Sequence, residues 1–131
     1  MPNPEIKPGQ HFLEAERQII HLMLKSKDAI GELMDDGVSS DFFDPHHQPL
    51  VESIYGEYVS SNHKRLLTRQ TYRQLLTDKK VRGDMMASLT IYDKCFIQAY
   101  ASPNDLGSLK KILTEGYMAR QCHVLFETFR K

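Results

Sequence analysis

The 131-residue sequence has no net charge, no tryptophan and only two cysteines. Seventeen basic residues balance seventeen acidic ones, so no overall field would draw the chain to nucleic-acid phosphates or anionic lipids. Cys95 and Cys122 are far apart and form no C-x-x-C pair, which is typical of a protein in a reducing cytosol. We therefore expect a cytoplasmic protein with two buried thiols and no direct contact with nucleic acid.

Long apolar runs and phosphate-binding glycine motifs are also lacking. No stretch approaches the roughly 18 apolar residues that a membrane-spanning helix needs. None of the seven glycines belongs to a G-x-x-x-x-G-K-S/T loop, and the G-x-S-x-G and H-E-x-x-H patterns do not occur. These absences argue against a membrane protein, a nucleotide hydrolase and the common hydrolase and metalloprotease classes. We expect no catalytic residue, no cofactor and no membrane partner.

Among the patterns in the sequence, the adjacent pair His46-His47 comes closest to a metal-binding motif. On a helix the side chains of His46 and His47 would diverge by about 100°, so they cannot jointly bind one metal without donors from elsewhere. Four aspartates lie between positions 35 and 44, but their spacing matches no calcium-binding loop. We expect His47 to pack inward, His46 to be exposed and no metal to be bound. A small metal-dependent enzyme using His46, His47 and the nearby aspartates is the least favoured of three functional hypotheses.

Hydrophobic periodicity predicts an all-α fold, because apolar residues recur at helical spacing and no two-residue alternation occurs. Residues 1–11 are rich in proline and are expected to form a flexible linker or tail. A helical bundle is predicted over residues 12–101, followed over residues 102–131 by a long helix or the start of a helical hairpin. Whether that last helix breaks at Gly116 stays open. Glu14 and Glu16 are expected on a solvated face of the first helix.

Capping residues mark where the helices should begin. Asp44 precedes Pro45, a residue suited to the first helical position, and Ser102 precedes a proline and an acid in a variant of the capping box. The predicted caps are Ser26 or Asp28, Asp44, Thr68, Asp84 and Ser102.

The last segment is the clearest candidate for an interface. Its apolar residues spread beyond one narrow stripe, which indicates either a well-buried core helix or a helix that meets a second surface. The residues selected as partner-binding are Tyr117, Met118, Arg120, Phe126 and Phe129.

Several short motifs, taken in order, resemble a known family. An A-E-R start, an apolar helix that ends in a basic-Ser-basic-Asp run, a Phe, a His that begins the next helix and an I-Y-x-x-Y ending all occur with matching spacing. They resemble the C-terminal helicase-interaction domain of bacterial DnaG-type primases, over most of residues 12–115. The residues that carry the resemblance are Ala15-Glu16-Arg17, Ile19 to Asp28, Phe43, His47, Ile54-Tyr55 and Tyr58.

The same fold is shared with the N-terminal domain of DnaB-type replicative helicases, which is the second hypothesis. Leu13 to Glu16 and Asp41-Phe42-Phe43 suit that branch equally well. Two departures favour the primase branch: His21 stands where the helicase branch usually has a glycine, and Arg82-Gly83 replaces its Gly-Gly. We therefore expect a primase-type domain, and because such a domain ends a long chain, we expect these residues to be a fragment.

The resemblance implies a role in DNA replication without catalysis by this fragment, although the parent chain would be a primase, a nucleotidyltransferase. A helical bundle and hairpin in a bacterial cytoplasm would bind the hexameric DnaB-type helicase and couple priming to unwinding in the primosome. The primase branch implies a monomer, whereas the helicase branch implies a dimerisation and primase-binding domain. The positions that would hold the bundle are Ala15, Ile19, Phe43, His47, Ile54 and Tyr55.

Overall fold

The structure, a computed structural model, describes the backbone of residues 10–78 and 84–130 and the side chains of residues 11–78 and 84–123. These residues form helices and connecting turns without any strand, so the predicted all-α class is confirmed for them. No helix in this part of the chain is both long enough and apolar enough to cross a membrane. The elements are α1 (Gln10–Lys25), α2 (Lys27–Asp35), η1 (Ser40–Phe42), α3 (Gln48–Ser60), α4 (Arg69–Thr77), α5 (Met85–Asp93), η2 (Lys94–Gln98), η3 (Pro103–Asp105) and α6 (Leu106–Arg130).

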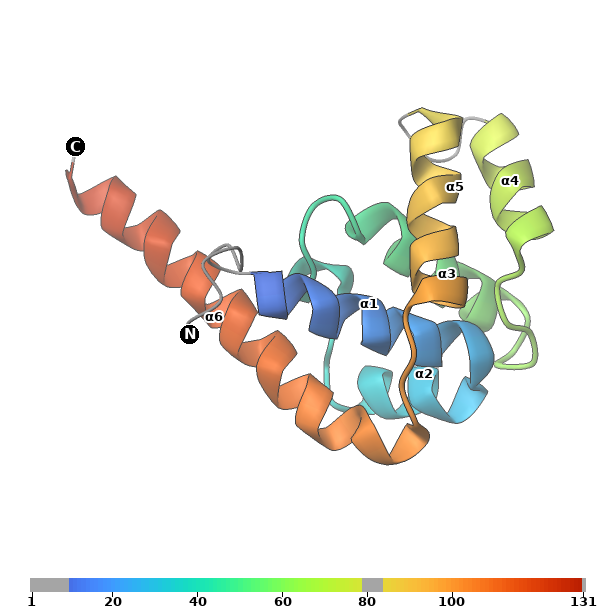
Figure 1. The fold of residues 1–131 in the computed structure, drawn as a ribbon, viewed down its shortest axis with the longest axis horizontal. Helices are drawn as coiled ribbons and strands as arrows, with labels where there is room; N and C mark the ends of the chain where they lie inside the picture. The colour runs from blue at the N-terminus through green and yellow to red at the C-terminus, as the bar shows by residue number, and fades with distance from the viewer. Residues whose placement is uncertain (1–9, 79–83, 131) are drawn as a thin grey trace, which may run out of the picture.

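Helix α1 lies at the centre of the bundle, in contact with α2, α3, α6 and η2. Figure 1 shows α6 running along α1, with α4 and α5 forming an antiparallel pair that projects from the other end of the molecule. Ile19, Ile20 and Met23 of α1 are fully buried, and burial of each such side chain contributes about 1.5–3 kcal/mol. The apolar face predicted from the sequence is therefore the core of the bundle.

Most helices begin at the predicted caps. The side-chain oxygen of Ser26 accepts a hydrogen bond from the amide of Ala29, and those of Thr68 and Asp84 cap α4 and α5 in the same way. Ser102 and Asp105 form a capping box, which begins as the single turn η3 and continues into α6. These starts are confirmed.

The predicted start of the third helix is wrong. Asp44 is followed by a separate turn that includes Pro45, and α3 begins only at Gln48 with His47 as its N-cap. The side-chain oxygen of Asp44 accepts from the amide of His46 at 3.0 Å, while the Asp44 amide donates to the side chain of Glu16 at 2.7 Å. A contact with α1 therefore fixes this turn, and the local capping pattern could not predict it.

The first half of α6 belongs to the bundle. Leu106, Leu109 and Leu113 are buried, so the predicted boundary between residues 101 and 102 does not separate two cores. At the other boundary, α1 begins at Gln10, two residues earlier than predicted, and residues 1–9 of the predicted tail lie outside the described residues. The bundle and the start of the long helix form one packed unit.

Candidate protein-interaction surface

Helix α6 continues through Gly116 as a single helix of 25 residues, so it forms the long helix and not the hairpin within the described residues. A glycine inside a helix costs about 1 kcal/mol relative to alanine. Here the glycine allows close packing, because a Cβ at Gly116 would lie 3.0 Å from two ring carbons of Phe12 in α1. The residue that could have broken the helix instead brings α6 close to the start of α1.

Two of the five predicted partner-binding residues contact the bundle itself. The ring of Tyr117 stacks on Phe42 of η1, with 4.4 Å between the ring centroids. The guanidinium of Arg120 donates a hydrogen bond to the backbone carbonyl of Phe42 at 2.6 Å and lies 3.7 Å from the carboxylate of Glu16. Tyr117 and Arg120 therefore fix the position of α6 on the bundle.

Of the other three predicted residues, Met118 lies between these two contacts, and Phe126 and Phe129 lie further along α6. Met118 is 58 % exposed. Phe126 and Phe129 are part of the α6 backbone, but their side chains lie outside the described residues. The structure thus separates Tyr117 and Arg120, which hold α6 on the bundle, from Met118, which is exposed.

A buried carboxylate lies beneath this anchor. Glu16 is only 1 % exposed, so its predicted place on a solvated face is wrong. Its Oε1 accepts hydrogen bonds from the Nδ1 of His47 and from the Asp44 amide, both at 2.7 Å. With the nearby guanidinium of Arg120 these residues form a group that we call the Glu16 cluster: Glu16, Asp44, His47 and Arg120. It joins α1, the turn before α3, and α6.

The sequence contained a signal for this cluster. Position 16 lies on the same stripe of α1 as Phe12, Ile19, Ile20 and Met23, at the i, i+3 and i+4 spacing that marks an inward face. A single acid on such a stripe must be hydrogen-bonded when the helix packs, because an unpaired buried carboxylate is strongly disfavoured. The place of Glu16 among the apolar residues of α1 therefore predicts its burial better than its spacing from Glu14 does.

The two adjacent histidines contact different carboxylates. His47 is buried, as predicted, and contacts Glu16, whereas His46, exposed as predicted, places its Nδ1 2.8 Å from Asp44. Burial alone would raise the pKa of Asp44, but the hydrogen bonds from the backbone and ring of His46, together with the charges of His46 and His47, lower it. Among the described residues, no three His, Cys, Asp or Glu side chains converge as metal ligands would.

The residues expected to hold the bundle are positioned to do so. Tyr55 is half-buried, and its hydroxyl donates a hydrogen bond to the Val38 carbonyl at 2.7 Å. Burial raises the pKa of Tyr55 to about 12. The remaining members are buried: Ala15, Ile19, Phe43, His47 and Ile54.

In the three residues after Arg120 whose side chains the structure describes, no face of α6 is covered. Gln121, Cys122 and His123 are all exposed, and three consecutive helical residues point in directions about 100° apart. Figure 1 shows this end of α6 extending past the start of α1, away from the bundle. The thiol of Cys122 was predicted to be buried and is exposed, whereas Cys95 is buried as predicted.

No protein-family model, curated protein or solved structure matches this chain. The resemblance to the primase and helicase domains therefore stays a prediction from the motifs.

Proposed function

We propose that this chain is a non-catalytic docking domain of the DNA replication machinery. In this proposal it binds a hexameric DnaB-type replicative helicase through residues 118–130 of α6, which we call the free end of α6. The observation that carries the proposal is the exposure of Gln121, Cys122 and His123 on all sides of one helix. An isolated helical segment gains little stability from its own hydrogen bonds, so a packed partner would stabilise this one. The resemblance of residues 12–115 to the primase domain supplies the identity of the partner.

The composition of the free end supports a role in binding. In sequence it carries Met118, Leu125, Phe126 and Phe129, and aromatic side chains in buried pockets are frequent anchors of protein interfaces. Tyr117, immediately before this segment, and Arg120, in its first turn, hold α6 on the bundle. The free end would therefore leave the bundle in a fixed direction, which lowers the entropic cost of docking.

Titration calorimetry against a DnaB-type helicase tests the proposal. We expect a complex with a dissociation constant of tens of micromolar or tighter, formed by a monomeric domain. Met118→Glu should weaken it by about tenfold or more, because a carboxylate would have to be buried. Ser108→Glu is the matched control, since Ser108 is exposed on the half of α6 that packs on the bundle. Absence of binding at about 100 µM would overturn the proposal.

A second candidate is the dimerisation domain of the helicase itself. Met118 and Cys122 are both exposed and lie four residues apart, so they share one face of α6 that a second copy of the helix could cover. Sedimentation velocity distinguishes the candidates. A dimer that Met118→Glu dissociates favours the helicase domain, and a monomer at all concentrations favours the primase-type domain.

A further inference from the structure

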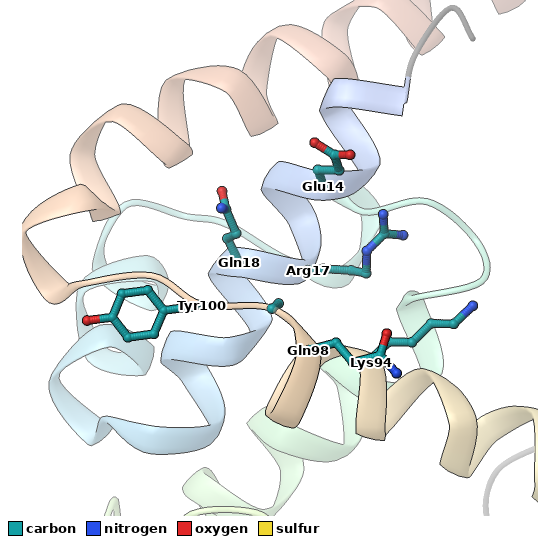
Figure 2. Close-up of a pocket in the computed structure, with 7 residues that line it drawn as sticks. Glu14, Arg17, Gln18, Lys94, Gln98 and Tyr100 are labelled. Carbon is teal, nitrogen blue, oxygen red and sulfur yellow. The ribbon is translucent and has the colours of Figure 1, made fainter. Parts of the chain in front are cut away.

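A polar hollow of about 390 Å³ lies between α1 and the segment that begins with η2 (Figure 2). It shares no residue with the free end of α6. Pockets of this size fall within the range of small-ligand sites, although most such sites are more apolar. Its polar lining comes from Glu14, Arg17 and Gln18 of α1 and from Lys94, Gln98 and Tyr100.

Two basic side chains from different elements lie at one side of the hollow. Figure 2 shows Arg17 of α1 and Lys94 of η2 extending to the same side, with Glu14 one turn before Arg17. Within the described part of the chain neither of the two basic groups forms an ion pair, although Arg17 is half-buried. A partly desolvated guanidinium gains from an anion, and a guanidinium beside an ammonium group is a combination that binds phosphate.

The other side of the hollow offers different chemistry. Gln18 and Tyr100 lie there in Figure 2, whereas Gln98 lies beside Lys94. A carboxamide both donates and accepts hydrogen bonds, as the edges of nucleobases do. The Tyr100 side chain is 75 % exposed, so its ring is accessible for stacking on a planar group.

The backbone of η2 shapes the hollow. The amide of Ala99 donates to the carbonyl of Lys94, five residues earlier, at 2.8 Å, so this turn is wider than an α-helical turn. Such π-turns are rare and concentrate at functional sites. Lys94 and Gln98, the first and last residues of the turn, both line the hollow.

We propose that this hollow binds a free nucleotide. Its phosphates lie between Arg17 and Lys94, its base stacks on Tyr100, and Glu14 accepts hydrogen bonds from sugar hydroxyls. A single strand of nucleic acid fits less well, because it needs a track of cations, whereas this hollow has two beside one carboxylate. The hollow shares no residue with the free end of α6, so failure of nucleotide binding would leave the proposed helicase binding unaffected, and the reverse also holds.

Calorimetric titration of the full chain with ATP, GTP, inorganic phosphate and an oligothymidylate tests the proposal. We expect saturable binding of a nucleotide with a dissociation constant between about 10 µM and 1 mM, and weaker binding of inorganic phosphate. Arg17→Gln and Lys94→Gln should each weaken nucleotide binding by about tenfold. Lys111→Gln removes an exposed charge from α6, outside the hollow, and should leave binding unchanged. Circular dichroism of each variant establishes that the fold is retained.

Four outcomes would overturn the assignment. No saturable binding of ATP or GTP at about 5 mM would remove the site altogether. Equal loss of affinity in Lys111→Gln and Arg17→Gln would indicate attraction by general charge. Phosphate that binds as tightly as the nucleotides would reduce the hollow to an anion site without base recognition. An oligothymidylate that binds more tightly than a mononucleotide, with a steep salt dependence, would indicate a nucleic-acid surface instead.

Discussion

Replacing Glu16 by alanine should strongly destabilise the fold, because two donors would lose their acceptor. The Asp44 amide and the Nδ1 of His47 both bind the Glu16 carboxylate at 2.7 Å, and His47 is buried. Each buried donor left without a partner costs about 1–3 kcal/mol. For the two donors together this amounts to about 2–6 kcal/mol. A loss of this size would consume much of the roughly 5–15 kcal/mol by which a domain is stable.

Urea unfolding followed by circular dichroism at neutral pH measures this loss as a change in the free energy of unfolding. Glu14→Ala is the matched control, since Glu14 is exposed on the same helix and its removal should change the free energy by less than about 0.5 kcal/mol. If Glu16→Ala does not fold, Glu16→Gln keeps an oxygen that can accept both hydrogen bonds and loses only the carboxylate charge and the second oxygen near Arg120, so it should lose less than the alanine variant.

A double-mutant cycle between Glu16 and His47 decides whether the hydrogen bond carries the effect. Residues joined in one network show interaction energies of about 0.5–3 kcal/mol, whereas independent substitutions add within about 0.5 kcal/mol. Additive losses from Glu16→Ala and His47→Ala would refute the reasoning, as would a loss below about 1 kcal/mol for Glu16→Ala.

Three further predictions concern glycine packing, pH and thiol reactivity. Gly116→Ala should lower the free energy of unfolding by about 1 kcal/mol, because the added Cβ would meet the ring of Phe12. Gly56→Ala should raise the free energy of unfolding by about 0.5–1 kcal/mol, because the space around Gly56 is open. Equal effects of the two substitutions in urea unfolding would contradict this prediction. Burial raises the pKa of Tyr55 from 10.0 to about 12, so the free energy of unfolding should fall as the pH rises from about 10 to about 12. In Tyr55→Phe this fall should be less steep. Equal slopes for the variant and the unchanged protein would contradict the prediction. Burial likewise raises the pKa of Cys95 to about 12, so in the folded protein a maleimide should modify only the exposed Cys122. Peptide mapping measures which of the two cysteines is modified. Bound helicase should protect Cys122 from the maleimide.

The sequence predicted correctly where local chemistry decides the outcome. Thr68 and Asp84 cap their helices because a short polar side chain can reach an amide two or three residues later, whatever surrounds it. Ile19 and Ile54 are buried because helical spacing places apolar residues on one face. Asp44 looked like another helix cap, but its side chain caps the separate turn before α3, and α3 begins only at Gln48.

The sequence alone determined the helical class, the inward faces of the helices and the presence of apolar residues at the end of the chain. Periodicity and capping are properties of neighbouring residues, which is why they can be read before the fold is known. Tertiary structure decided that Glu16 is buried, that Arg120 and Tyr117 contact η1, and that Gln121, Cys122 and His123 after them are exposed. It also brought Arg17 and Lys94 to one hollow. These features depend on contacts between residues far apart in the chain, and no local pattern encodes them.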